Sequence, residues 1–226
     1  MKRLDFLSTL LLGSGGLILP NGVVAQTADA LPNVLLLGDS ISLGYTGVVI
    51  EELKGRVKEY RPLNAKGGYI NCQGTTNAMK HLDQWLEIAP KWDVIHFNFG
   101  LHDLKHVDPV TGKNSKKEDD PQQADLKAYE RNLKAIVKKL EATGAQLIFA
   151  TTTSYPDRPG GPLRRADQPE KYNKTALKIM KKYGVKINDL DALTKPRLAE
   201  LQPPNNVHFT KEGSAILGKQ VAQRIV

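Results

Sequence analysis

Short apolar runs and segments with helical spacing alternate along this chain, and that alternation is the strongest constraint on its fold. Apolar runs predict strands at residues 34–37, 56–63, 93–99, 146–151 and 185–188. Apolar residues at helical spacing predict helices at residues 42–54, 75–87, 122–143, 169–183 and 211–225. Strands that alternate with helices form parallel sheets, because each helix carries the chain back to the start of the next strand. The pattern therefore predicts one α/β domain of three α/β/α layers, with helices on both faces of a central parallel sheet.

Residues 1–25 have the pattern of a secretory signal peptide. Lys2 and Arg3 precede an apolar, glycine-containing stretch, and small residues around Ala25 suit cleavage by a signal peptidase. A second candidate cleavage site lies at residues 28–30, and an uncleaved N-terminal anchor is the alternative. The apolar stretch is too short to predict a membrane span. We expect export to the periplasm or the cell exterior, a folded domain over residues 32–226, and no stable membrane insertion after cleavage.

Charge and cysteine content narrow the classes of function. The formal net charge is +8, but the basic residues are mixed with acidic ones and form no aromatic-interleaved patch, so nucleic-acid binding is not predicted. Cys72 is the only cysteine, which excludes an intrachain disulfide and suggests a small buried residue. Metal-binding spacings such as HExxH or CxxC and phosphate-cradling glycine loops do not occur. We expect neither a metal nor a cofactor, and the composition leaves the oligomeric state open.

Two distant segments contain the residues with the clearest chemical potential. Residues 34–45 read VLLLGDSISLGY and place Ser40 at a strand-to-helix turn, while NNVHFT at residues 205–210 places His208 just before the last helix. A serine needs a base to become a nucleophile near neutral pH, and histidine is the usual base. The alternatives are a helix-capping Ser40 and a core or capping His208. Together the two segments favour a serine nucleophile with a histidine base.

The segment GDSISLGY resembles the first block of the SGNH (GDSL-type) esterase and lipase superfamily, and the resemblance extends from about Pro32 to the end of the chain. It implies a flavodoxin-like fold and hydrolysis of carboxylic esters without a cofactor. It also implies catalytic roles for Ser40 and His208. The implied oxyanion hole consists of the Ser40 N–H, the Gly74 N–H and a side chain from the third block. Gly67 and Gly68 lie in the same loop as Gly74 and are alternatives to it.

The third and fourth blocks depart from the family pattern. Where the family has Gly-x-Asn-Asp, this chain has His102 in place of asparagine. A neutral imidazole has one N–H and can donate to an oxyanion. The alternative is that His102 contacts substrate beside a looser oxyanion hole. Where the family has Asp-x-x-His, this chain has Asn205 in place of aspartate.

An asparagine at position 205 cannot supply the charge of an aspartate to His208. Three possibilities follow. The Asn205 side-chain oxygen or a backbone carbonyl accepts from His208 and leaves a Ser–His dyad, which is the interpretation we favour. Alternatively, Asp189 or Asp191 substitutes for the missing carboxylate, or the enzyme is impaired.

The loops that follow the strands are expected to meet at one rim of the sheet, where open α/β sheets bind ligands. Asp39 and Asp103 are expected to hold these loops through hydrogen bonds to backbone amides. Residues 106–121 and 154–169 are polar, and we expect them to form mobile surface loops that wall a substrate groove.

The sequence as a whole predicts an exported serine esterase that hydrolyses short acyl esters, principally acetyl esters on carbohydrate. Polar loops and an aromatic content of 6% argue against a lipid substrate. One alternative is a lysophospholipase or thioesterase acting on longer acyl chains. Another is a catalytically impaired carbohydrate-binding relative, suggested by the changes at His102 and Asn205. The expected partner is a small-molecule or polysaccharide ester.

Overall fold

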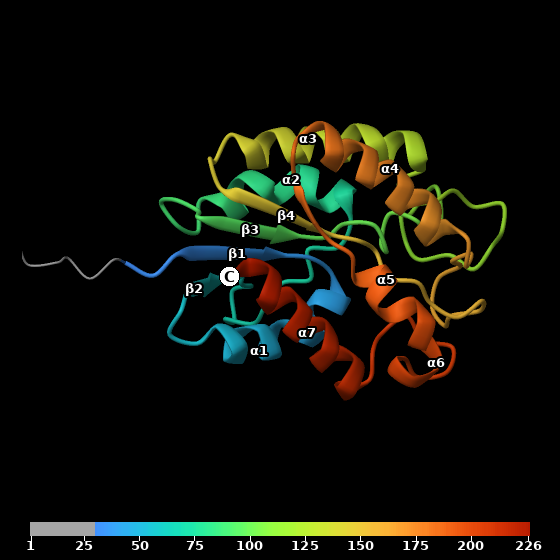
Figure 1. The fold of residues 1–226 in the computed structure, drawn as a ribbon. Helices are drawn as coiled ribbons and strands as arrows, with labels where there is room; N and C mark the ends of the chain where they lie inside the picture. Colours follow the sequence, from blue (N-terminus) through green and yellow to red (C-terminus); the bar gives the residue numbers. More distant parts are fainter. Residues whose placement is uncertain (1–29) are drawn as a thin grey trace, which may run out of the picture. The chain divides into compact units, whose positions relative to one another are not determined.

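A parallel sheet forms the centre of the domain. The computed structural model describes residues 30–226, and the predicted signal peptide lies outside them. Leu31–Val226 form one compact unit. The strands are β1 (Asn33–Leu37), β2 (Lys58–Tyr60), β3 (Val94–Phe97), β4 (Gln146–Ala150) and β5 (Lys186–Asn188). All neighbouring pairs are parallel and the order is β2-β1-β3-β4-β5 (Figure 1). The predicted α/β class is therefore confirmed.

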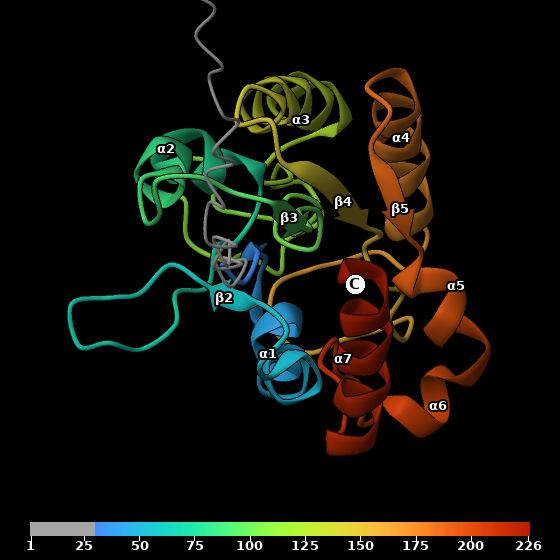
Figure 2. The same ribbon diagram turned by 60° about the vertical axis from the view of Figure 1, so that its left-hand side comes forward.

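Helices cover both faces of the sheet, as Figures 1 and 2 show. One face carries α2 (Thr75–Leu86), α3 (Leu126–Glu141) and α4 (Gln168–Lys182), and the other carries α1 (Ser40–Leu53), α5 (Leu190–Thr194) and α7 (Lys211–Ile225). Alternate residues of β1 serve the two faces: Leu35 packs toward α2–α4 and Leu36 toward α1 and α7. Because both faces are covered, the central strands β1, β3 and β4 are mostly apolar, whereas the edge strands β2 and β5 carry charged residues.

The helices of residues 190–201 were not predicted. This segment contains α5, a 3-10 turn η1 (Lys195–Arg197) and α6 (Leu198–Leu201). Elements of three to five residues are too short to show an apolar period. The long helix predicted from residue 122 begins instead at Leu126, because Asp125 caps it by accepting a hydrogen bond from the Ala128 amide at 2.7 Å.

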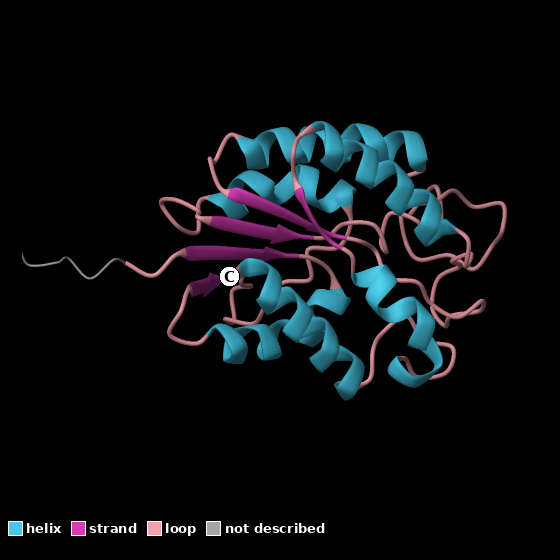
Figure 3. Ribbon diagram, viewed as in Figure 1, coloured by secondary structure: helices cyan, strands magenta, loops and turns pink. Residues whose placement is uncertain are grey.

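The strand order creates a crevice between β1 and β3. After β1 the chain forms β2 on one side of β1, and it then crosses to form β3 on the other side. Such a reversal of strand order is a topological switch point, and open α/β sheets bind ligands there, beyond the carboxyl ends of the strands. Figure 3 shows long loops at this end of the sheet. Two of them, predicted as separate mobile walls, are hydrogen-bonded to each other: Leu163 O accepts from His106 N at 3.0 Å, and Leu163 N donates to Ser115 O at 2.7 Å.

Within residues 30–226, the helices are all too short or too polar to cross a bilayer.

Candidate active site

Ser40 is the first residue of α1 and lies at the carboxyl end of β1. The buried segment that starts in β1 continues to Asp39, whose carboxylate caps α1 by accepting from the Ile41 amide at 2.9 Å. The first amides of a helix have no intrahelical acceptor, and their combined dipole favours negative charge nearby. The partly exposed Ser40 hydroxyl therefore lies at the crevice, beside amides that can receive an anion.

His208 reaches Ser40 from the opposite end of the sequence. Its loop is fixed on one side by Val207, which is buried and accepts from the Gln202 side chain at 3.2 Å. On the other side, Thr210 caps α7 by accepting from the Gly213 amide at 3.0 Å. Between these anchors, His208 Nε2 lies 2.9 Å from Ser40 Oγ. The structure thus brings the two predicted residues within hydrogen-bond distance across 168 positions.

Asn206 orients the His208 ring. Its side-chain oxygen lies 3.0 Å from the His208 backbone nitrogen and 2.9 Å from His208 Nδ1. A backbone N–H can only donate, so the Asn206 atom facing it is the amide oxygen. That oxygen can only accept, so Nδ1 carries the ring hydrogen. Nε2 is then the free acceptor that faces the Ser40 hydroxyl, which is the tautomer a general base requires.

The contact expected of Asn205 is made by Asn206 instead. Asn205 is exposed and has a left-handed backbone with φ of 54°, and its carbonyl accepts from the Gly160 amide at 2.6 Å. This turn lets the next residue form the Asx turn beneath His208. The other candidates are engaged elsewhere: Asp189 accepts from Thr151 Oγ1 at 2.8 Å and caps α5, and Asp191 accepts from the Ser154 amide at 2.6 Å.

Burial and a neighbouring cation keep the His208 imidazole neutral. Partial burial lowers the pKa of His208, and the positive charge of Arg164 lowers it further. The neutral ring predominates near neutral pH, so Nε2 is available to accept a proton.

Gly74 occupies a position that admits only glycine. A Cβ on Gly74 would lie 2.5 Å from Asp103 Oδ2. Asp103 accepts from the Thr75 amide at 2.9 and 3.0 Å and from Thr75 Oγ1 at 2.5 Å, so its carboxylate fixes the start of α2. The backbone bond from Cys72 N to Gly38 O, at 3.0 Å, ties this loop to the serine turn. Within residues 30–226, the Gly74 amide makes no hydrogen bond to protein and remains free for a ligand.

The alternative glycines belong to a separate turn. Gly67 N donates to Asn64 O at 2.9 Å, and Gly68 N donates to the Asn64 side chain at 3.2 Å. Because both amides already have acceptors, Gly74 is the better oxyanion donor of the three.

His102 is a neutral, largely buried imidazole. Burial, followed by the charges of Lys105 and Arg164, lowers the pKa of His102 to about 3. Its Nδ1 atom is buried without a hydrogen-bond partner in the described chain. Nε2 is therefore the nitrogen through which His102 can donate to a substrate, and it carries no charge at working pH.

Two contacts at the site were not predicted: those of the buried Arg61 behind Ser40, and that of Asn206 with His208. Arg61, from the end of β2, donates to Gly38 O at 3.2 Å and to Thr46 Oγ1 at 3.0 Å, and it also contacts Ser42 Oγ. Its sequence surroundings give no sign of this role. The Asn206 contact has a weak sequence signal, because the side chain of an asparagine commonly accepts a hydrogen bond from the backbone N–H two residues later, in an Asx turn. In the described part of the chain, no group of three or more His, Cys, Asp or Glu side chains is placed to hold a metal ion.

A parallel sheet with a Ser–His pair at its carboxyl edge is the arrangement of an α/β serine hydrolase. Residues 36–216 match the family described as GDSL-like Lipase/Acylhydrolase. The chain belongs to this family and is a hydrolase that acts on ester bonds.

Solved structures of low sequence identity share the fold. An acetyl xylan esterase, AlAXEase, aligns with a TM-score of 0.64 and 14% identity over 86% of this chain and 100% of that chain. The lipase/acylhydrolase from Enterococcus faecalis gives 0.65 and 18% over 86% and 95%. A catalytic mutant of Axe2, an acetylxylan esterase from Geobacillus stearothermophilus, gives 0.63 and 16% over 87% and 94%. Comparison with curated proteins gave no match.

Proposed function

We propose that this chain is an exported serine esterase that removes short acyl groups, principally acetyl, from carbohydrate. The observation that carries the proposal is the 2.9 Å contact between His208 Nε2 and Ser40 Oγ, with Nδ1 held by Asn206. Acetylxylan esterases among the structures of similar fold support the substrate class. The signal-peptide pattern of residues 1–25 supports export.

The first half of the reaction acylates Ser40. Ser40 Oγ attacks the ester carbonyl carbon as its proton passes to His208 Nε2. The imidazolium keeps its Nδ1–H bond to Asn206, which orients the ring without adding a negative charge. Collapse of the tetrahedral intermediate breaks the bond to the sugar oxygen, and this oxygen takes the proton from His208.

The tetrahedral intermediate needs donors aimed at one oxygen. The Ser40 and Gly74 amides and the His102 ring are the donors we assign. Ser40 and Gly74 belong to loops joined by the Cys72–Gly38 backbone bond, which fixes the two amides relative to each other. In the second half-reaction, water attacks the acyl-enzyme, His208 takes the water proton, and the acid leaves as Ser40 regains its hydrogen.

The placement of the apolar hollows favours a small acyl group. A hollow of about 410 Å³ beside β2 is lined by apolar side chains such as Tyr69, Trp85 and Ile88. Neither Ser40 nor His208 lines it. A long acyl chain would need such a hollow next to the nucleophile.

Hydrolysis of an acyl series from acetyl to dodecanoyl tests the proposal, together with acetylated xylan as a polymeric substrate. We expect acetyl esters to be the best substrates. Optimal activity on octanoyl or longer esters would instead indicate a lysophospholipase or thioesterase. Ser40→Ala should abolish hydrolysis, whereas Ser214→Ala, a serine in the first turn of α7, should retain it.

Covalent labelling and localisation test the remaining points. A serine-directed phosphonate should label Ser40 in the folded protein; unlabelled, folded protein would indicate a carbohydrate-binding relative that has lost turnover. Fractionation of cells that express the full chain should place it outside the cytoplasm. Deletion of residues 2–25 should keep it inside.

A further inference from the structure

Arg164 is a buried arginine beside the Ser–His pair. Only 8% of its surface is exposed, and its Nε donates to Leu101 O at 3.2 Å, which places it against the loop of His102. Its positive charge lowers the pKa values of His102 and His208. The guanidinium therefore lies within electrostatic reach of the groups that surround the ester.

Lys105 adds a second largely buried cation within electrostatic reach of Arg164 and His102. Its side chain and backbone are 9% exposed. Burial lowers the pKa of Lys105, and the positive charge of Arg164 lowers this pKa further. Among the residues that the structure describes, neither Arg164 nor Lys105 lies within ion-pair distance of a carboxylate. Their terminal nitrogens are not among the fully buried, unpartnered atoms of the described chain, so they keep access to solvent and to a ligand. Arg164 lies within electrostatic reach of Asp39, and Lys105 within reach of Asp103, but neither cation makes an ion pair with these carboxylates. Both cations therefore remain available to an anionic ligand.

The guanidinium borders a hollow large enough for part of a sugar. This hollow has a volume of about 260 Å³, and Arg158, Lys116 and Arg164 line it together with a single acidic residue, Asp157. It adjoins the histidine loop, since Gly160, which also lines it, donates to the carbonyl of Asn205 at 2.6 Å. An anionic group held here would lie beside the loop that carries His208.

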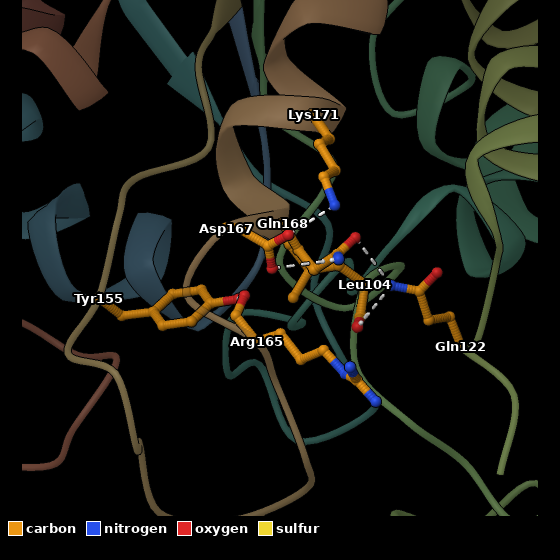
Figure 4. A network of polar contacts seen from close by, with 7 residues as sticks. All are labelled: Leu104, Gln122, Tyr155, Arg165, Asp167, Gln168 and Lys171. Atoms are coloured by element: carbon orange, nitrogen blue, oxygen red, sulfur yellow. Dashed lines mark hydrogen bonds and ion pairs between the residues drawn. The ribbon is translucent and has the colours of Figure 1, made fainter. Parts of the chain in front are cut away.

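The backbone around Arg164 is fixed before substrate arrives. On one side, Leu163 N donates to Ser115 O at 2.7 Å. On the other, Arg165 O accepts from the Tyr155 hydroxyl at 3.0 Å, within the polar network that fastens this loop to α4 (Figure 4). A preorganised guanidinium binds carboxylates and similar groups with little loss of conformational entropy.

We propose that Arg164 and Lys105 form an anion-binding subsite beside Ser40 and His208, and that the preferred substrate is an acylated sugar bearing a carboxylate or a sulfate group. The proposal rests on the esterase function proposed above and specifies its substrate class. Arg164 supplies planar donors for the anion, and Lys105 supplies a second positive charge.

Three acetylated methyl glycosides that differ only at C6 test this proposal: glucose, glucuronic acid and glucose 6-sulfate. We expect kcat/KM of the natural chain to be about 10- to 100-fold higher for a charged ester than for the neutral one, as for a charge-assisted hydrogen bond. The charged ester with the higher kcat/KM identifies the preferred anion. Arg164→Gln and Lys105→Gln should each reduce this preference.

Arg165→Gln is the matched control. Its side chain lies on the same loop but is exposed and faces Glu118 at 3.4 Å, so the preference should persist. The subsite is overturned if the natural chain hydrolyses all three esters equally, or if Arg164→Gln slows all three equally, which would assign Arg164 to the oxyanion or to folding. Hydrolysis of none of them would contradict the esterase function itself. If Arg164→Gln does not fold, Lys105→Gln and stronger inhibition of the natural chain by glucuronate than by glucose decide the question.

Discussion

The side-chain oxygen of Asn206 accepts hydrogen bonds from both the backbone and the ring of His208, at 3.0 and 2.9 Å. The backbone bond identifies the amide oxygen, and the ring bond then places the imidazole hydrogen on Nδ1. An aspartate in this role would orient the ring and also stabilise the imidazolium by its charge. The amide performs only the first task, so the chain retains the correct tautomer without a charged third residue.

Asn206→Ala should lower kcat for an acetyl ester about 10-fold, the equivalent of one neutral hydrogen bond. Asn206→Asp should raise the pKa of His208, because a carboxylate favours the charged imidazolium, and should not lower kcat. Asn205→Gly is the control, since glycine accepts the positive φ at that position. Steady-state kinetics of the three variants test the assignment, and an equal loss in Asn205→Gly would contradict it.

The pH profile of kcat/KM should report the neutral form of His208. Burial and Arg164 lower the pKa of His208, so its base form is present above a midpoint that lies below 6.5 and is lost as pH falls through that midpoint. Arg164→Gln removes a positive charge and should shift the acidic limb to higher pH. A midpoint above 6.5 in the natural chain, or an unshifted limb in the variant, would contradict this electrostatic account.

The sequence alone predicts the features that depend on residues close to each other along the chain. β1, β3 and β4 are mostly apolar runs because both faces of the sheet are covered, and Ser40 lies three residues beyond the end of β1. The Ser40–His208 pair was predictable because each residue lies in a recognisable local segment. The Arg164 contact with Leu101 joins residues 63 positions apart through two irregular loops, and no period or motif marks it. Asn206 was missed because a left-handed residue shifts the contact by one position.

Gly74→Ala should impair catalysis through a steric clash. The new Cβ would lie 2.5 Å from Asp103 Oδ2 and would displace the carboxylate or the Gly74 amide. We expect kcat to fall about 10-fold or more. Complete loss of an oxyanion donor would lower kcat by about 10²- to 10³-fold. The control is Gly47→Ala in α1, where a Cβ meets nothing within 4 Å; it should stabilise the fold by about 0.5–1 kcal/mol. Unchanged kcat in Gly74→Ala would remove this amide from the oxyanion hole.

Arg61→Met should destabilise the domain by about 3 kcal/mol, since a buried guanidinium bonded to Gly38, Ser42 and Thr46 is lost and its acceptors are left unpaired. The turn that holds Ser40 should also loosen, which would lower kcat at a temperature where the variant remains folded. Arg56→Met, an exposed arginine before β2, should change the free energy of unfolding by less than about 0.5 kcal/mol. Equal effects in urea denaturation would show that the buried contacts contribute nothing.

The titration of Asp103 should lower the free energy of unfolding as pH rises from about 4 to about 7. Burial raises the pKa of Asp103 to about 7 from 3.8, so in this range the folded chain binds more protons than the unfolded chain and the free energy of unfolding falls with pH. Buried His96 and His102, each with a pKa of about 3, give the opposite sign below 6.5. Asp103→Asn leaves these histidines in place and retains an oxygen acceptor for Thr75. Urea denaturation of both proteins at about pH 5 and about pH 8 isolates the contribution of Asp103. The natural chain should lose stability relative to Asp103→Asn between the two pH values, and a constant difference would show that the carboxyl titrates alike in the folded and unfolded states.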